Sequence, residues 1–169
     1  MSPRRIAQVA ARLGLHLVAL TDHNSALNCP AFADACVKEK ITALFGIEVT
    51  TSEEIHVLAL FETVEQALEL GQRIYNSLPK IPYNPERHGD QVYVNEAEEI
   101  LGEVGTYLGV GSSFSLEELG SLIANLEGLF IPAHIDRPSN SLLSQLGRIP
   151  ELAYSALEIT RLPCKHPVP

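Results

Sequence analysis

Leu17-Val18-Ala19-Leu20-Thr21-Asp22-His23-Asn24 is the stretch that most strongly indicates the fold, because an apolar, β-prone run ends in an Asp-His pair and turn-forming residues. In a barrel or an open α/β sheet, such strand ends carry the ligands of the site. An ordinary strand end with a capped turn would look the same, since Asp and Asn favour turns by themselves. The segment alone leaves both interpretations open.

Two later segments end in the same way. Gly46-Ile47-Glu48-Val49-Thr50-Thr51 closes a second apolar run with a carboxylate, and Phe130-Ile131-Pro132-Ala133-His134 closes a third with a histidine. The connection at residues 51–54 is too short for a parallel crossover, so residues 55–61 should pair with the preceding strand as an antiparallel hairpin. This hairpin would place His56 beside Glu48 at one edge of the sheet.

The expected elements alternate as in an α/β protein. Helical spacing and capping motifs predict helices at residues 3–13, 31–38, 63–76, 115–126 and 140–146. Apolar runs predict strands at residues 15–21, 42–50, 55–61, 129–135 and 153–160. Residues 78–111 form a Pro- and Gly-rich excursion, with short strands expected at 91–94 and 106–110. The first and last main strands would lack neighbours, and such exposed edges predict self-association.

Size and composition limit the interpretation. With 169 residues, 46% of them hydrophobic, we expect a single domain over residues 1–169 but not a closed barrel, since eight βα units take about 250 residues. The net charge of −9 argues against long nucleic acid as a partner, because such binding depends on Lys and Arg. Three cysteines without a Cys-x-x-Cys pair favour a reducing, cytoplasmic setting. No apolar run is long enough to span a membrane.

The ligand-type residues occur in the order of a known family. Thr21-Asp22-His23, Gly46-Ile47-Glu48, His56 and Ala133-His134 resemble the metal motifs of the PHP family, the polymerase and histidinol phosphatase group of metal-dependent phosphoesterases. The sequence lacks the His-x-His strand with which that family normally opens and the Asp-x-His strand with which it closes. The resemblance implies an α/β fold that is a partial or distorted TIM-like barrel, mostly parallel with one antiparallel hairpin.

The resemblance also implies roles for individual residues. A divalent transition metal (Zn, Mn or Fe) would be bound by four side chains, with the carboxylate as the bridge, namely His23, Glu48, His56 and His134. Asp22 would accept a hydrogen bond that fixes a histidine tautomer, and Arg137 would contact substrate phosphate. Taken singly, each histidine could equally be structural, and Arg137 could be a surface residue paired with Asp136 or another acid.

The activity implied by the resemblance is metal-dependent hydrolysis of a small phosphorylated molecule. Because four of the family's ligands are missing, we expect the metal to be absent or substoichiometric, and the chain to be truncated and inactive or weakly active. One alternative is a degenerate PHP-like module with a regulatory or ligand-binding role and no catalysis. Another is a fragment of a longer enzyme.

Overall fold

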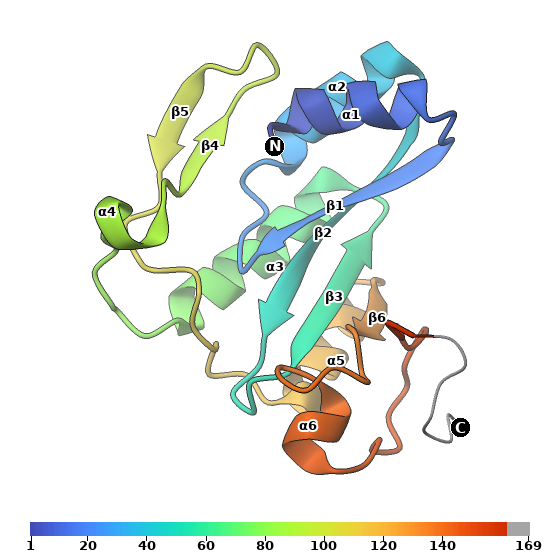
Figure 1. Ribbon diagram of the computed structural model, residues 1–169, viewed down its shortest axis with the longest axis vertical. Coiled ribbons are helices and arrows are strands. Elements are labelled where there is room, and N and C mark those ends of the chain that lie inside the picture. The colour runs from blue at the N-terminus through green and yellow to red at the C-terminus, as the bar shows by residue number, and fades with distance from the viewer. Residues whose placement is uncertain (162–169) are drawn as a thin grey trace.

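An open four-stranded sheet forms the centre of the computed structural model, which describes residues 1–161 (Figure 1). The strand order is β1 (Leu17–His23), β2 (Thr42–Thr50), β3 (His56–Phe61) and β6 (Leu129–Pro132). β1 pairs in parallel with β2, whereas β3 pairs antiparallel with both β2 and β6, so three strands share one direction. The expected α/β class, the antiparallel hairpin and the partial barrel are confirmed, because these four strands form an open row.

Local sequence signals explain the helices. Outside residues 78–111, the helices are α1 (Pro3–Arg12), α2 (Cys29–Glu39), α3 (Val64–Ser77), α5 (Leu116–Asn125) and α6 (Leu142–Leu146). Ser2 caps α1, and capping boxes begin α3 at Thr63 and α5 at Ser115. The five predicted helices are therefore confirmed, with ends that differ by a residue or two. Within the described chain, no helix combines the length and apolar character that crossing a membrane requires.

One face of the sheet carries the core. Ile47, Ala59 and Phe130 lie side by side on this face, because the strand registers pair them, and all three are buried. α3 packs here through Gly71, where a Cβ would lie 3.4 Å from Ile47. α5 packs through Gly120 against the ring of Phe130. Figure 1 shows both helices behind the sheet.

The opposite face of the sheet is much less covered. It carries Leu17 and Leu129, which are 56% and 44% exposed, together with half-buried leucines of β2 and β3. Side chains alternate between the two faces along a strand, so His23, Glu48 and His56 belong to this open face as well. The candidate ligands therefore lie at one end of an exposed apolar surface.

The excursion at residues 78–111 is partly ordered into regular elements. It contains the short helix α4 (Pro85–His88) and a two-stranded antiparallel sheet of β4 (Val92–Val94) and β5 (Ile100–Glu103). The expected strand at residues 91–94 is confirmed. α4 and β5 were not predicted from the sequence, because their residues show no sustained period.

The strand expected at residues 106–110 is wrong. Thr106 forms only an isolated bridge, with Pro82. The carbonyl groups of Leu108 and Val110 do not join a ladder, because both accept hydrogen bonds from the side chain of Asn24. A side chain from a distant loop thus takes the acceptors that a neighbouring strand would have used.

The strand expected at residues 153–160 is also wrong, and the one expected at 129–135 is shorter. β6 ends at Pro132, and His134 has a left-handed backbone with φ of 33°. This turns the chain out of the extended conformation, and proline supplies no N–H for a continued ladder. The final segment still contacts β6, since the Glu158 N–H donates to the Pro132 carbonyl at 3.1 Å.

The close approach of β2 to β3 at Gly46 gives a stability test. A Cβ at this position would collide with the carbonyl oxygen of Ala59. Gly46→Ala should therefore destabilise the protein by about 1–3 kcal/mol in urea unfolding, as for other overpacked sites. Gly105→Ala is the control, because its Cβ would meet nothing within 4 Å, and it should be neutral or stabilising by up to about 1 kcal/mol. Equal effects of the two changes would contradict the strand packing.

Candidate metal centre

Four side chains of the ligand type meet at one edge of the sheet. β1 and β2 end there, and their register places His23 opposite Glu48. β3 begins there with His56, opposite Thr50, as the hairpin requires. β6 ends at the same edge, and His134 follows its last residue by two positions. The four residues predicted as metal ligands are thus brought together by strand direction and register.

Glu48 lies at the centre of this cluster. Its Oε1 is 2.9 Å from Nδ1 of His56 and 3.4 Å from Nε2 of His134, and its Oε2 is 4.0 Å from Nδ1 of His23. The rings of His23 and His56 pack edge to face with centroids 5.0 Å apart, and those of His56 and His134 do so at 5.2 Å. One carboxylate therefore faces three imidazoles that come from three separate segments.

The surroundings keep Glu48 ionised. The neighbouring imidazoles of His23 and then His56 hold the pKa of its carboxyl well below its usual range, and they outweigh desolvation, which acts in the opposite direction. The side chain of Glu48 is 27% exposed, whereas that of His134 is 8% exposed. The cluster is thus open to solvent beside the carboxylate and closed beside His134.

The unpartnered ring nitrogens fit a bound cation. Nδ1 of His56 and both ring nitrogens of His134 are buried and have no hydrogen-bond partner among the described residues. Ligand atoms about 2.05 Å from a tetrahedral ion lie about 3.3 Å from one another. The separations from Glu48, 2.9 to 4.0 Å, bracket that value. His23, Glu48 and His56 also offer ligand atoms that all lie within 4.8 Å of one another. The donors therefore suit Zn, Mn or Fe in both chemistry and spacing.

The structure does not bring Asp22 to the cluster. Asp22 alternates with His23 along β1 and therefore points to the opposite face of the sheet. There its Oδ2 accepts a hydrogen bond of 2.8 Å from the side chain of Asn28, just before α2. The expectation that Asp22 fixes the tautomer of a site histidine is corrected accordingly, because its hydrogen bond goes to α2.

The backbone of Arg137 contacts the cluster at His134. It is exposed, and its N–H donates to the carbonyl of His134 at 2.9 Å. Asp136, its expected partner, instead accepts hydrogen bonds from the backbone and side chain of Thr160, which lower the pKa of the Asp136 carboxyl. The guanidinium of Arg137 thus projects from the loop that follows His134.

Three residues that contact the cluster were missed by the sequence analysis. Thr50 Oγ1 lies 2.9 Å from Nε2 of His23. A signal for it existed, because Thr50 follows Glu48 by two positions and so shares its face. Asn24 bonds the backbone at both Glu48 and Thr50. Glu158 Oε2 accepts a hydrogen bond of 2.7 Å from the backbone of His134, across a separation that local sequence patterns do not reveal.

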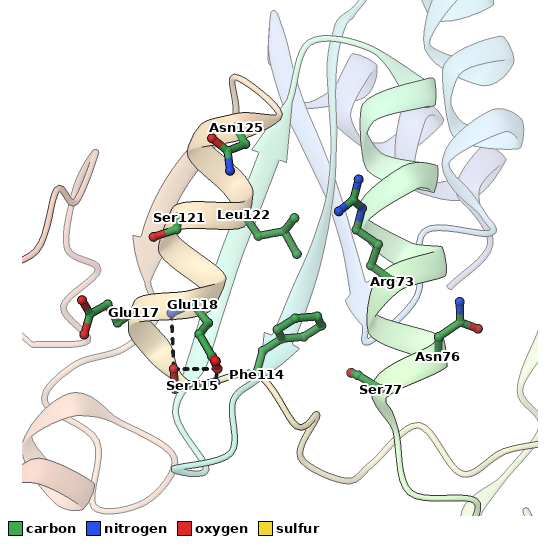
Figure 2. A pocket seen from close by; sticks show the side chains of 10 residues that line it. All are labelled: Arg73, Asn76, Ser77, Phe114, Ser115, Glu117, Glu118, Ser121, Leu122 and Asn125. Atoms are coloured by element: carbon green, nitrogen blue, oxygen red, sulfur yellow. Dashed lines mark hydrogen bonds between the residues drawn. The ribbon is translucent and has the colours of Figure 1, made fainter.

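A hollow between α3 and α5 is separate from this cluster. Figure 2 shows Phe114 and Leu122 pointing from the α5 side toward α3. Two of its charged side chains have partners on their own helices: Glu118 closes the capping box at Ser115, and Arg73 pairs with Glu69 on α3. Among the described residues, the lining of the hollow includes no histidine or cysteine, so it offers no group of imidazoles like that of the cluster.

Comparison with solved structures supports the fold. A protein from Bifidobacterium adolescentis that is assigned as a metal-dependent phosphoesterase has a TM-score of 0.57 and 15% identity, over 93% of this chain and 71% of its own. The lesion-specific endonuclease Q from Pyrococcus furiosus has a TM-score of 0.54 and 20% identity, over 88% of this chain and 34% of its own. This chain thus spans only about a third of the endonuclease. No curated protein matches the sequence.

A further similar structure corrects the expected partners. It is endonuclease Q in complex with a 27-mer duplex that carries an abasic lesion at the active site. Its TM-score is 0.55 with 20% identity, over 85% of this chain and 33% of the other. The expectation that nucleic acid is excluded is therefore wrong for proteins that contain this fold, and a small phosphorylated molecule is not singled out.

The family assignment follows from the sequence match. The family model of the PHP domain matches residues 1–134, which is most of the chain. The match includes all three strands that supply His23, Glu48 and His56, and it ends at His134, the fourth member of the cluster. The chain belongs to the PHP domain family.

Proposed function

We propose that the chain binds a divalent transition metal at the cluster of His23, Glu48, His56 and His134, and that this centre hydrolyses a phosphate ester. The observation that carries the proposal is the set of buried ring nitrogens without partners around one ionised carboxylate. Imidazole left unpaired in the interior is costly unless it meets a ligand. A cation between Glu48 and the histidines would satisfy Nδ1 of His56 and Nε2 of His134, the two unpartnered nitrogens that face the carboxylate.

Each residue has a distinct part in this proposal. Glu48 offers two oxygens, one toward His56 and His134 and the other toward His23, so its carboxylate would be the ligand common to all three histidines. His134 anchors the closed side of the centre, while the exposed side of Glu48 leaves room for substrate. When bound, a divalent ion supplies Lewis-acid polarisation of the phosphoryl group and makes water more acidic. Arg137 would contact the phosphate of the substrate, since its loop begins at His134.

The proposed substrate class is a phosphate ester, of small molecules or of nucleic acid. Both kinds of chemistry appear among the similar structures, in a protein assigned as a phosphoesterase and in a DNA endonuclease. The open side of the cluster is compatible with either, because it continues into the uncovered face of the sheet. Activity on small phosphate esters and on a duplex with an abasic site would distinguish the two classes.

A second candidate is a metal-binding module without catalysis. The observation that favours it is the number of ligands. The described residues bring four candidate ligands together. Two metal ions with three protein ligands each would need six ligands, or fewer if some are shared. Under this alternative, metal would bind and order the sheet edge but no ester would be cleaved. Because the ligands are few, the main proposal also expects residues 1–169 to have weak activity.

Metal binding tests the centre directly. Protein purified without chelator should contain well under one equivalent of transition metal, and added Zn²⁺ or Mn²⁺ should bind in calorimetry. Glu48→Gln and His134→Ala should each weaken this binding at least about 10-fold, because each removes a ligand. His16→Ala is the matched control, since His16 is an exposed histidine before the opposite end of β1, and it should bind like the wild type. Wild-type affinity in both cluster variants would rule out the site.

Hydrolysis tests the chemistry. With saturating Mn²⁺ or Zn²⁺, we expect slow release of p-nitrophenol from a phosphate monoester or diester, or cleavage of a duplex that carries an abasic site. The double variant Glu48→Gln, His134→Ala should return the rate to background, and His16→Ala should leave it unchanged. Metal binding without hydrolysis of any of the three substrates would favour the non-catalytic module. Hydrolysis that survives the double variant would refute the assignment of the site.

A further inference from the structure

Asn24 joins three parts of the chain at the metal edge. Its backbone N–H donates to the Glu48 carbonyl at 3.0 Å, and its Oδ1 accepts from the Thr50 N–H at 3.0 Å. Its Nδ2 donates to the carbonyls of Leu108 and Val110 at 2.7 and 2.8 Å. The residue is 1% exposed and has a left-handed backbone with φ of 50°. Asn24 is therefore a buried clamp with both amide hydrogens and its carbonyl oxygen in use.

The residue type at this position follows from these demands. Glycine and aspartate tolerate a left-handed backbone as asparagine does, but glycine has no side chain and aspartate has no N–H to donate. Only asparagine accepts from one backbone N–H and donates to two carbonyls from this conformation. The clamp also explains how the irregular excursion is attached, since residues 108 and 110 are held by Asn24.

The clamp fixes Thr50 in place. The Thr50 N–H is held by Asn24, and the Thr50 carbonyl accepts from the backbone and the hydroxyl of Ser112 at 2.8 and 2.9 Å. Thr50 is buried, at 5% exposure, and its remaining polar group is the hydroxyl. That hydroxyl lies 2.9 Å from Nε2 of His23. The position of the oxygen beside His23 is thus set by the backbone on both sides of it.

We propose that Thr50, held by Asn24, is a positioning residue that makes Nδ1 of His23 the metal-ligating atom. In this role the hydroxyl accepts a hydrogen bond from Nε2–H, which leaves the lone pair of the neutral ring on Nδ1. Nδ1 is the nitrogen that faces Glu48, at 4.0 Å from Oε2. A partner on the second ring nitrogen fixes both the tautomer and the orientation of a ligating histidine. This inference rests on the metal binding proposed above.

Two substitutions at Thr50 and one at its neighbour Thr51 distinguish a role in positioning the His23 ring from an effect on the stability of the fold. Thr50→Val removes the hydroxyl with little change of shape, and Thr50→Ser keeps it. Thr51→Val is the matched control, because Thr51 is buried next to Thr50 and its hydroxyl accepts only from the Ile55 N–H in the described contacts. Asn24→Gly should also free the Thr50 hydroxyl from its fixed position, since glycine adopts the left-handed backbone but has no side chain to hold the Thr50 N–H.

The first measurement uses metal-free protein. At about pH 8 with chelator present, nitrogen-15 spectra of the rings show which nitrogen carries the proton. We expect a His23 Nε2–H that is protected from solvent exchange in the wild type, in Thr50→Ser and in Thr51→Val. The protection should be lost in Thr50→Val and in Asn24→Gly. An unchanged His23 signal in a folded Thr50→Val protein would overturn the inference, whether or not metal binds.

The second measurement is the affinity for Zn²⁺ or Mn²⁺ by calorimetry. Thr50→Val and Asn24→Gly should bind about 10–100-fold more weakly, while Thr50→Ser and Thr51→Val bind within a few fold of the wild type. Wild-type protein that binds no metal would refute the proposed function, and the metal-free spectra would still decide the orientation of His23. Wild-type protein that binds metal, with equal affinity in Thr50→Val, would refute the role of Thr50 alone. If Thr50→Val does not fold, Asn24→Gly provides the same comparison.

Discussion

The contact between the Glu48 carboxylate and three imidazoles is the interaction on which the candidate site depends. It exists because β2 lies inside the sheet, with β1 on one side and β3 on the other. The parallel neighbour ends where β2 ends, and the antiparallel neighbour begins there, so both deliver a histidine to the same edge. A shift of one residue in either register would turn Glu48 or its partner to the helix-covered face. The site is therefore as sensitive to strand pairing as the core is.

The two faces of the sheet have different roles: one packs the hydrophobic core, and the other carries the candidate site. Ile47 and Val49 flank Glu48 in the sequence and are fully buried under the helices, while Glu48 itself points to the open face. Period-two alternation thus lets three successive residues serve the core, the site and the core again. In the same way, Asp22 faces α2 while His23 faces Glu48. The open face also leaves leucines in contact with water, so the described fold gains less from hydrophobic burial than a sheet covered on both sides.

Prediction from sequence succeeded where the evidence was local. Capping boxes located α3 and α5, and the short link between β2 and β3 predicted the hairpin that places His56 near Glu48. It failed where contacts distant in the sequence decide the backbone. The carbonyls near residue 108 are taken by Asn24, and the left-handed turn at His134 ends β6 early. Asp22 was predicted to contact a site histidine, but adjacent residues of a strand point to opposite faces of the sheet, so Asp22 and His23 cannot both face the site.

The net charge of −9 does not exclude nucleic acid as a partner, because it counts only the protein's own ionisable groups. A phosphate ester that reaches a metal centre is attracted by bound cations, whose charge is absent from a sum over side chains. The same acidic chain that repels a polyanion over its whole surface would also favour divalent cations at the proposed centre around Glu48. A structure of the same fold holds an abasic duplex at its active site. If the proposed centre binds metal, the local field at the sheet edge would therefore attract a phosphate ester more than the overall charge would repel it, and the overall charge would mainly set how strongly salt affects the encounter.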